Sequence, residues 1–272
     1  MSVNKYKITV IALMLVAVIS GCEKATETHK NIDSDFNIRM MESSLRTLRL
    51  YFSTTMVYPH TGYSIDVSWQ QSSNVIDISF EGIIDNGSGF AVVVPITAVI
   101  DLGTLSNGRY NLNFYNGTVI QSGMLIVSSD SYETNFRHNP NFHFINASLN
   151  KVPENTIWLA ISYNEEKILS SFLEVLTSLG ATKITCHPGY YSINVTYPYL
   201  HYSVFKVEKN GSITYSPKEV TNTIVDWGGR FMRSFVFQYS GDNASIEQLI
   251  KQYKEQMEIT VYTDKGERFT SW

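Results

Sequence analysis

The stretch Ile157-Trp158-Leu159-Ala160-Ile161-Ser162-Tyr163, followed by Asn164-Glu165-Glu166, decides the fold of the C-terminal half. This seven-residue run, apolar except for Ser162, is typical of a strand. Asn164 suits an N-cap, and two glutamates in the first turn favour a helix after it. Apolar residues then recur on one helical face before a stop at Gly180: Ile168, Leu169, Phe172, Leu173, Leu176 and Leu179. The stretch therefore predicts a strand followed by an amphipathic helix.

A second strand-helix-strand unit is predicted at the end of the chain. Its strands are expected over Ser234–Tyr239 and Glu258–Tyr262, with a helix cap among Asp242, Asn243 and Ser245. The apolar face of the helix consists of Ile246, Leu249, Ile250, Tyr253 and Met257. The same unit therefore occurs twice in this half of the chain.

Further strands are expected between the two units, over Thr182–His187, Tyr190–Tyr197, Tyr202–Val207 and Ser212–Tyr215. Two helices with one apolar stripe each can cover only one side of a sheet, so residues 151–272 are predicted to form a two-layer α/β sandwich. The order of elements is similar to a ferredoxin-like βαββαβ arrangement with an extra hairpin inserted between its halves. That resemblance implies a fold and no activity.

The preceding half has the pattern of short strands. Apolar or alternating runs recur and are separated by turn residues: Ser64–Trp69, Val75–Phe80, Phe90–Val94, Ala98–Leu102, Tyr110–Phe114 and Gly123–Val127. Three dipeptides between them tolerate the positive φ of tight turns: Asn86-Gly87, Asn107-Gly108 and Asn116-Gly117. Strands at this spacing predict an antiparallel β-sandwich over residues 48–150.

The run Leu105-Ser106-Asn107-Gly108-Arg109-Tyr110-Asn111-Leu112 resembles the strand entry of immunoglobulin-like modules in exported bacterial proteins. This resemblance implies an Ig-like fold for the sandwich and carries over no functional residue.

Residues 128–153 are expected to be a connection with a short strand near Phe142–Ala147. The segment Phe36–Phe52 fits both a helical stripe and an alternation, so we expect a short helix or coil that leads into a strand near Leu48.

The N-terminus has the pattern of a secretory signal. Lys5 and Lys7 precede an uncharged apolar run, Ile8–Ile19, that is short for a bilayer span. Ile19-Ser20-Gly21-Cys22 resembles the lipobox of bacterial lipoproteins, which implies cleavage after residue 21 and acylation of Cys22, palmitate included. An ordinary cleaved signal with a coincidental cysteine is the alternative. Residues 1–21 are thus predicted to be a signal peptide, and residues 22–47 a tether and lead-in.

Removal of residues 1–21 removes two lysines and no acid, so the formal charge changes from −4 to −6. Phosphate binding needs clustered Lys and Arg, so nucleic acid is not an expected partner. With Cys22 acylated, Cys186 is left without a disulfide partner. Its apolar surroundings favour a buried small hydrophobe over a reactive thiol.

The sequence contains no motif for catalysis, metal or nucleotide binding, and no cofactor is expected. Neither a Walker A loop nor a G-x-G-x-x-G is present. His138 and His143 stand five apart across a proline, which suits surface histidines better than metal ligands. A glycosidase pair would need two acids that only the fold can bring together, and five acids are candidates: Asp77, Glu81, Asp101, Asp226 and Glu258.

Aromatic residues beside polar ones offer a contact surface. Tyr197, Tyr199 and Trp227 are predicted at or near loops, where flat rings suit a sugar or a protein partner. Aromatic residues are also ordinary strand residues that face a core.

The preferred hypothesis is a non-catalytic, lipid-anchored binding or assembly protein of the cell envelope, in contact with the membrane through its lipid. The outer membrane is favoured over the inner membrane. An envelope hydrolase, whose site is assembled only in three dimensions, and a structural subunit of an envelope complex are the alternatives.

Overall fold

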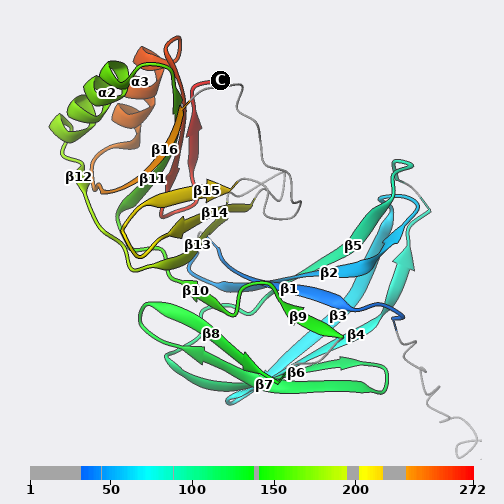
Figure 1. Ribbon diagram of the computed structural model, residues 1–272. Coiled ribbons are helices and arrows are strands. Elements are labelled where there is room, and N and C mark those ends of the chain that lie inside the picture. Colours follow the sequence, from blue (N-terminus) through cyan, green and yellow to red (C-terminus); the bar gives the residue numbers. More distant parts are fainter. Residues whose placement is uncertain (1–31, 44, 88, 138–140, 195–201, 217–230) are drawn as a thin grey trace, which may run out of the picture. The chain divides into compact units, whose positions relative to one another are not determined.

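The computed structural model describes residues 32–43, 45–87, 89–137, 141–194, 202–216 and 231–272 (Figure 1). The described chain is mostly β, as the sequence predicted. Residues 31–272 form one compact unit, and its described strands are arranged in two sheets.

The larger sheet follows the strand order β3-β4-β6-β7-β8-β10-β13-β1-β2-β5, with β9 beside β1 and with β14 and β15 extending from β13. Its strands are β1 (Phe36–Glu42), β2 (Leu48–Tyr58), β3 (Tyr63–Ser72), β4 (Val75–Asp85), β5 (Val94–Asp101), β6 (Gly108–Asn116), β7 (Val119–Val127), β8 (Ser131–Phe136), β9 (Phe142–Phe144), β10 (Ser148–Asn150), β13 (Gly189–Asn194), β14 (Tyr202–Val207) and β15 (Ile213–Ser216). Neighbouring strands are antiparallel except for β4 with β6, β1 with β9 and β13 with both β1 and β10.

The core of the larger sheet is rich in phenylalanine. Alternation along the strands places one apolar set on the inner face. The rings contact one another within about 4 to 6 Å between centroids, and the central members are Phe36, Phe52, Phe80, Phe114 and Phe142. Each buried ring contributes about 1.5–3 kcal/mol to stability, so this cluster carries much of the free energy of folding of the sheet.

The smaller sheet has the strand order β12-β16-β11-β17-β18, and its pairs are antiparallel. Its elements are β11 (Thr156–Tyr163), α2 (Glu166–Ser178), β12 (Thr182–Lys183), β16 (Phe231–Gln238), α3 (Asn243–Tyr253), β17 (Met257–Thr263) and β18 (Arg268–Thr270). Both helices cover the same face of this sheet (Figure 1). Leu169 and Phe172 of α2 and Ile246 and Leu249 of α3 are buried there.

The opposite face of the smaller sheet packs against the larger one. Trp158 on β11 contacts the rings of Tyr191 and Phe205, on β13 and β14, at 4.8 and 5.1 Å between centroids. The hydroxyls of Tyr215 and Tyr262 lie 2.6 Å apart across the same boundary. The strands β13 to β15 therefore hydrogen-bond into one sheet while their side chains cover the other.

Several sequence predictions are confirmed in these elements. The strand at Thr156–Tyr163 and the helix after it are present, although the helix is capped at Glu165 rather than Asn164. Asp242 caps α3, its carboxylate accepting a hydrogen bond from the Ala244 amide at 3.1 Å. On the outer face of this helix, Glu247 and Lys251 form an ion pair at 3.7 Å.

Other predictions are wrong. Phe36–Glu42 is neither helix nor coil but β1, a strand whose residues are nearly all buried. The predicted strand over Phe90–Val94 begins only at Val94, and the residues before it are exposed. The strand predicted over Thr182–His187 ends at Lys183, while β8 and β18 were not predicted.

The two halves expected from the sequence are joined by strand pairing. The strand β13, from the second half, pairs with β1 and β10 of the first. The larger sheet therefore includes strands from both sides of the predicted domain boundary at residue 150.

Candidate functional site

A cavity of about 570 Å³ lies where the end of β1 meets several connecting segments. These are the β1–β2 turn, the β5–β6 link, the β7–β8 turn, the β10–β11 link and the β12–β13 link. Its lining residues are neutral polar, apolar and charged side chains in similar measure: Thr104, Leu105, Ser129, Asp130, Tyr132, Asn150, Lys151, Val152, Ile184, Thr185, Cys186, His187 and Tyr191, with Glu42, Arg46, Pro153 and Glu154 at one end.

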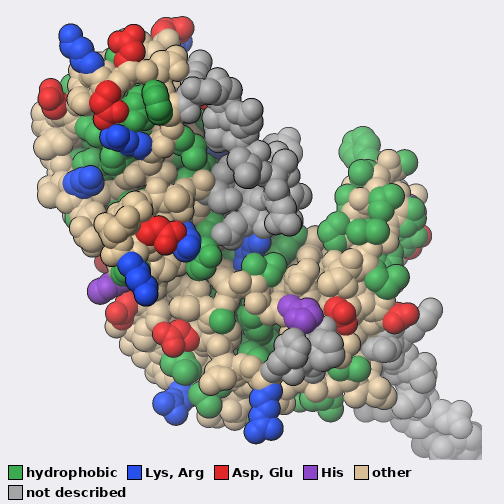
Figure 2. Space-filling model, viewed as in Figure 1, with side chains coloured by type: hydrophobic (Ala, Val, Ile, Leu, Met, Phe, Trp, Pro, Cys, Tyr) green, Lys and Arg blue, Asp and Glu red, His purple; other side chains and the backbone are tan. Residues whose placement is uncertain are grey.

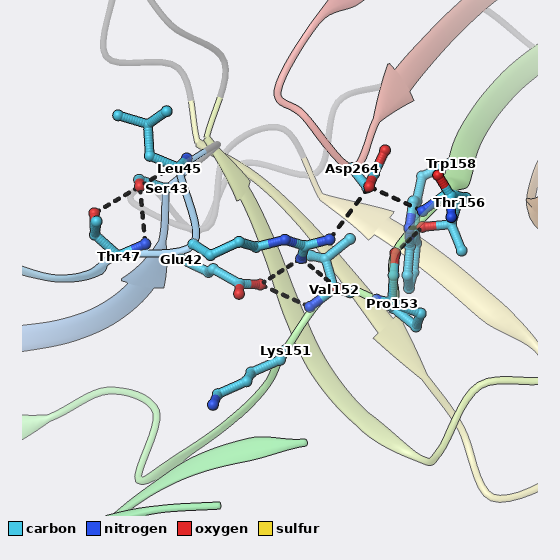
Figure 3. A network of polar contacts seen from close by, with 12 residues as sticks. Glu42, Ser43, Leu45, Thr47, Lys151, Val152, Pro153, Thr156, Trp158 and Asp264 are labelled. Atoms are coloured by element: carbon cyan, nitrogen blue, oxygen red, sulfur yellow. Dashed lines mark hydrogen bonds and ion pairs between the residues drawn. The ribbon is translucent and has the colours of Figure 1, made fainter. Parts of the chain in front are cut away.

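A polar network forms that end of the cavity (Figure 3). The buried Glu42 carboxylate accepts a hydrogen bond from the Val152 amide at 2.7 Å and lies 3.4 Å from Nη1 of Arg46. Arg46 also donates to the Val152 carbonyl. Its Nη2 reaches Asp264 at 3.3 Å, and Asp264 accepts from the Asn155 amide at 2.9 Å. One guanidinium thus joins the β1–β2 turn, the β10–β11 link and the β17–β18 turn.

The backbone of the β1–β2 turn positions this guanidinium. Arg46 adopts a left-handed conformation with φ of 61°, which non-glycine residues rarely adopt. The turn is closed by hydrogen bonds between Ser43 and Thr47, whose hydroxyls lie 2.6 Å apart. The local strain is therefore offset by contacts that the side chain of Arg46 makes elsewhere.

Burial dominates the electrostatics of the cavity. It raises the pKa of Glu42, while the hydrogen bond from Val152 and the charge of Arg46 act in the opposite direction. Burial also raises the pKa of the Cys186 thiol to about 11 and helps to raise that of Tyr191 to about 12. Cys186 is therefore a neutral thiol near pH 7, as its apolar surroundings predicted, and has little nucleophilic character.

Lys151 and Tyr191 are, like Glu42 and Arg46, bonded within the protein. Lys151 donates to the Ser128 carbonyl at 2.6 Å and lies 4.9 Å from the centre of the Tyr132 ring. Tyr191 donates its hydroxyl hydrogen to the His187 carbonyl at 2.9 Å. Neutral groups such as Thr104 and Thr185 line the cavity as well. The arrangement suits hydrogen bonding to a neutral polar ligand.

Of the residues that the sequence singled out, Cys186 lines this cavity. Cys22, Tyr197, Tyr199 and Trp227 lie outside the described residues, as do the signal peptide, His138 and Asp226. Of the acids proposed for a hydrolase, Asp77, Glu81 and Asp101 have partners on adjacent strands: Asn113 at 2.8 Å, Ser68 at 2.8 Å and Arg49 at 2.8 Å. Glu258 lies beside a different hollow, next to Trp272.

The cavity has no contiguous signature in the sequence, because its lining comes from segments far apart in the chain. Glu42 gave the one local signal, an acid that directly follows the apolar residues Met40 and Met41. A carboxylate is seldom fully buried unless it is paired. The position of Glu42 therefore indicates a partner elsewhere in the chain, but the sequence does not show which residue that partner is.

No family model matches the chain, and a comparison with curated proteins gave no match. Within the described ranges, no three His, Cys, Asp or Glu side chains are grouped as a metal site would require. No helix in the same ranges is both long and apolar enough to cross a bilayer.

Proposed function

We propose that the chain is a lipid-anchored, non-catalytic binding or assembly protein of the cell envelope, placed at the outer membrane. The lipobox-like Ile19-Ser20-Gly21-Cys22 supports the anchor. The cavity carries the binding part of the proposal, because Glu42, Arg46 and Lys151 are engaged in internal contacts while neutral polar side chains such as Thr104, Asn150 and Thr185 also line it. Its ligand is a glycan or a polar surface loop of an envelope protein.

We further propose an Ig-like fold for the strands of residues 48–150 and a ferredoxin-like fold for the smaller sheet with its helices. The antiparallel hairpins β3–β4 and β6–β7 support the first, whereas the parallel β4–β6 pair departs from it. For the second, the support is the order β12-β16-β11-β17 with both helices on one face. The inserted strands β13 to β15 stand between its two halves in the chain.

The anchor is tested by the mass and location of the chain. The parent protein should carry the mass of its acyl chains and remain with membranes, and Cys22→Ser should lose both properties. If the masses differ only by the substituted atom and both proteins stay on membranes, the anchor is refuted.

Binding is tested by filling the cavity without removing an internal contact. We expect the acylated full chain, in detergent, to retain a ligand on a glycan array or with isolated envelope proteins. Affinity for that ligand should fall at least tenfold in Thr185→Trp, because the indole occupies the cavity. Thr177→Trp, at an exposed threonine on α2, is the matched control. Equal affinity in both variants would exclude the cavity.

The tyrosine and tryptophan positions proposed from the sequence are tested in the same assay. Tyr199→Ala and Trp227→Ala should weaken binding if these rings contribute to the contact. Unchanged affinity in both would remove them from the binding surface, while the Thr185→Trp result would still decide on the cavity.

A further inference from the structure

The end of the larger sheet formed by the last residues of β2 and the loop before β5 exposes a group of apolar side chains, here called the apolar tip. Figure 2 shows hydrophobic side chains gathered over this region, where β2 and β5 extend away from the rest of the sheet in Figure 1. Its members are exposed by 45 to 84% of their surface: Met56, Val57, Ile84, Phe90, Val92 and Val93.

The tip is held in a fixed conformation. The Phe90 amide donates to the Thr61 hydroxyl at 2.9 Å, and the Phe90 carbonyl accepts from the Thr61 amide at 3.2 Å. Gly89 packs so closely on Gly62 that an added Cβ would lie 2.4 Å from its amide nitrogen. The backbone of Phe90 is thus hydrogen-bonded to Thr61, yet its ring is 84% exposed.

The exposed apolar side chains of the tip come from three segments of the chain. Met56 and Val57 are consecutive residues near the end of β2, where the pairing with β5 is irregular, and both are about half exposed. Ile84 lies on β4, and Phe90, Val92 and Val93 precede β5. A fluid apolar medium can surround side chains that are spread in this way.

The charge of the region indicates which kind of lipid surface the tip would meet. The sequence contains no Lys or Arg between Arg49 and Arg109, and the nearby Asp85 lies 3.7 Å from His60. The tip therefore has no Lys or Arg with which to attract anionic headgroups.

The segment that leads from the N-terminus into β1 lies beside the tip. The Ser34 hydroxyl accepts from the Met56 amide at 3.2 Å, and the Asp35 carbonyl accepts from the Thr55 amide at 2.9 Å. Cys22 precedes Ser34 by about 12 residues, which span at most about 40 Å when extended. A bilayer that held an acyl chain on Cys22 would thus be within reach of Met56.

We propose that the apolar tip inserts into the headgroup region of a neutral lipid bilayer and forms a second membrane contact beside the N-terminal lipid. This inference rests on the proposed lipid anchor for its orientation. Phe and aliphatic side chains at such an edge are the residues that bury in the outer part of the acyl region.

The test uses a chain of residues 23–272, which retains the whole compact unit and lacks the anchor. Phe90→Cys in this chain carries an environment-sensitive fluorophore, and the buried Cys186 stays unlabelled. With phosphatidylcholine vesicles we expect its emission to rise at least twofold and to be quenched by nitroxide on the acyl chains. The same fluorophore at Leu179→Cys, an exposed apolar position on the helix side, should not respond.

A second measurement is flotation with the same vesicles. The fraction of protein that floats should fall at least fivefold in Phe90→Ser/Val93→Ser and stay unchanged in Leu179→Ser. The proposal is overturned if the fluorophore in Phe90→Cys does not respond, if it responds only to anionic vesicles, or if its emission rises with protein concentration alone, as contact with a second copy would require. Because the test chain has no lipid, a failure here leaves the Cys22→Ser result to judge the anchor separately.

Discussion

The Nη2 atom of Arg46 lies 3.3 Å from Oδ2 of Asp264, a residue 218 positions further along the chain. The pair connects the β1–β2 turn of the larger sheet with the β17–β18 turn of the smaller one. The same guanidinium balances the buried charge of Glu42, so a single side chain fixes one end of the cavity.

Arg46→Ala should destabilise the protein by about 3 kcal/mol, because it leaves the buried Glu42 carboxylate without its cation. Urea unfolding measures the change. Adding Glu42→Gln should recover more than half of the loss, since no buried charge then remains. Arg233→Ala, which breaks an exposed pair with Glu166, is the control and should cost less than about 1 kcal/mol. Equal losses in the two single variants would contradict a special role of Arg46.

Glu42 also predicts a pH dependence. Burial raises its pKa in the folded state above the ordinary value of 4.5. Its contribution to stability is therefore fully present below its unfolded pKa and is lost as the pH rises through the folded pKa. We expect Glu42→Gln to gain stability relative to the parent as the pH rises from 4.5, measured by thermal unfolding at each pH. A difference that is constant with pH would show that the carboxyl does not titrate in this range.

Gly123 lies directly under the ring of Phe136 on the neighbouring strand, and a Cβ there would meet the ring at 2.3 Å. Gly123→Ala should therefore destabilise the larger sheet by about 1–3 kcal/mol through overpacking. Gly108→Ala is the matched control, since an added Cβ at the start of β6 has no neighbour within 4 Å. Chemical denaturation of the two variants should separate them clearly.

The Cys186 thiol should be unreactive in the folded protein. It is 8% exposed, and burial raises its pKa to about 11, so little thiolate forms in neutral buffer. We expect the Ellman reagent to modify it slowly in buffer and at least about a hundredfold faster in concentrated guanidinium. Rapid reaction without denaturant would indicate an accessible, activated thiol and reopen the catalytic alternative.

The elements that the sequence predicted well are those with a local pattern. The helix α2 and the strand β11 each show a clear pattern, and the Asn116-Gly117 turn follows from its dipeptide, with φ of 57° at Gly117. By contrast, β1 is buried on both faces, so Met40 and Met41 remove the alternation that would have identified a strand. The apolar run at Phe90–Val93 looks like a strand because sequence alone cannot show that no core covers it.

The residues of the candidate site could not be predicted from the sequence for a different reason. Glu42, Val152 and Asp264 come together only because β1 pairs with β13 and because the two sheets pack through β13 to β15. Parallel pairing between distant segments leaves no periodic trace in either one. The residues named from the sequence were chosen for being aromatic and near turns, which is a property of many loops.

The parallel contact between Glu42 and Ile193 also sets the order in which the larger sheet can be completed during synthesis. The end of β1 at Glu42 keeps one edge unpaired until β13, about 150 residues further along the chain, has been made. Unsatisfied strand edges attract other unfolded chains. Pulse-chase experiments should therefore find the nascent protein protease-sensitive until β13 has been synthesised.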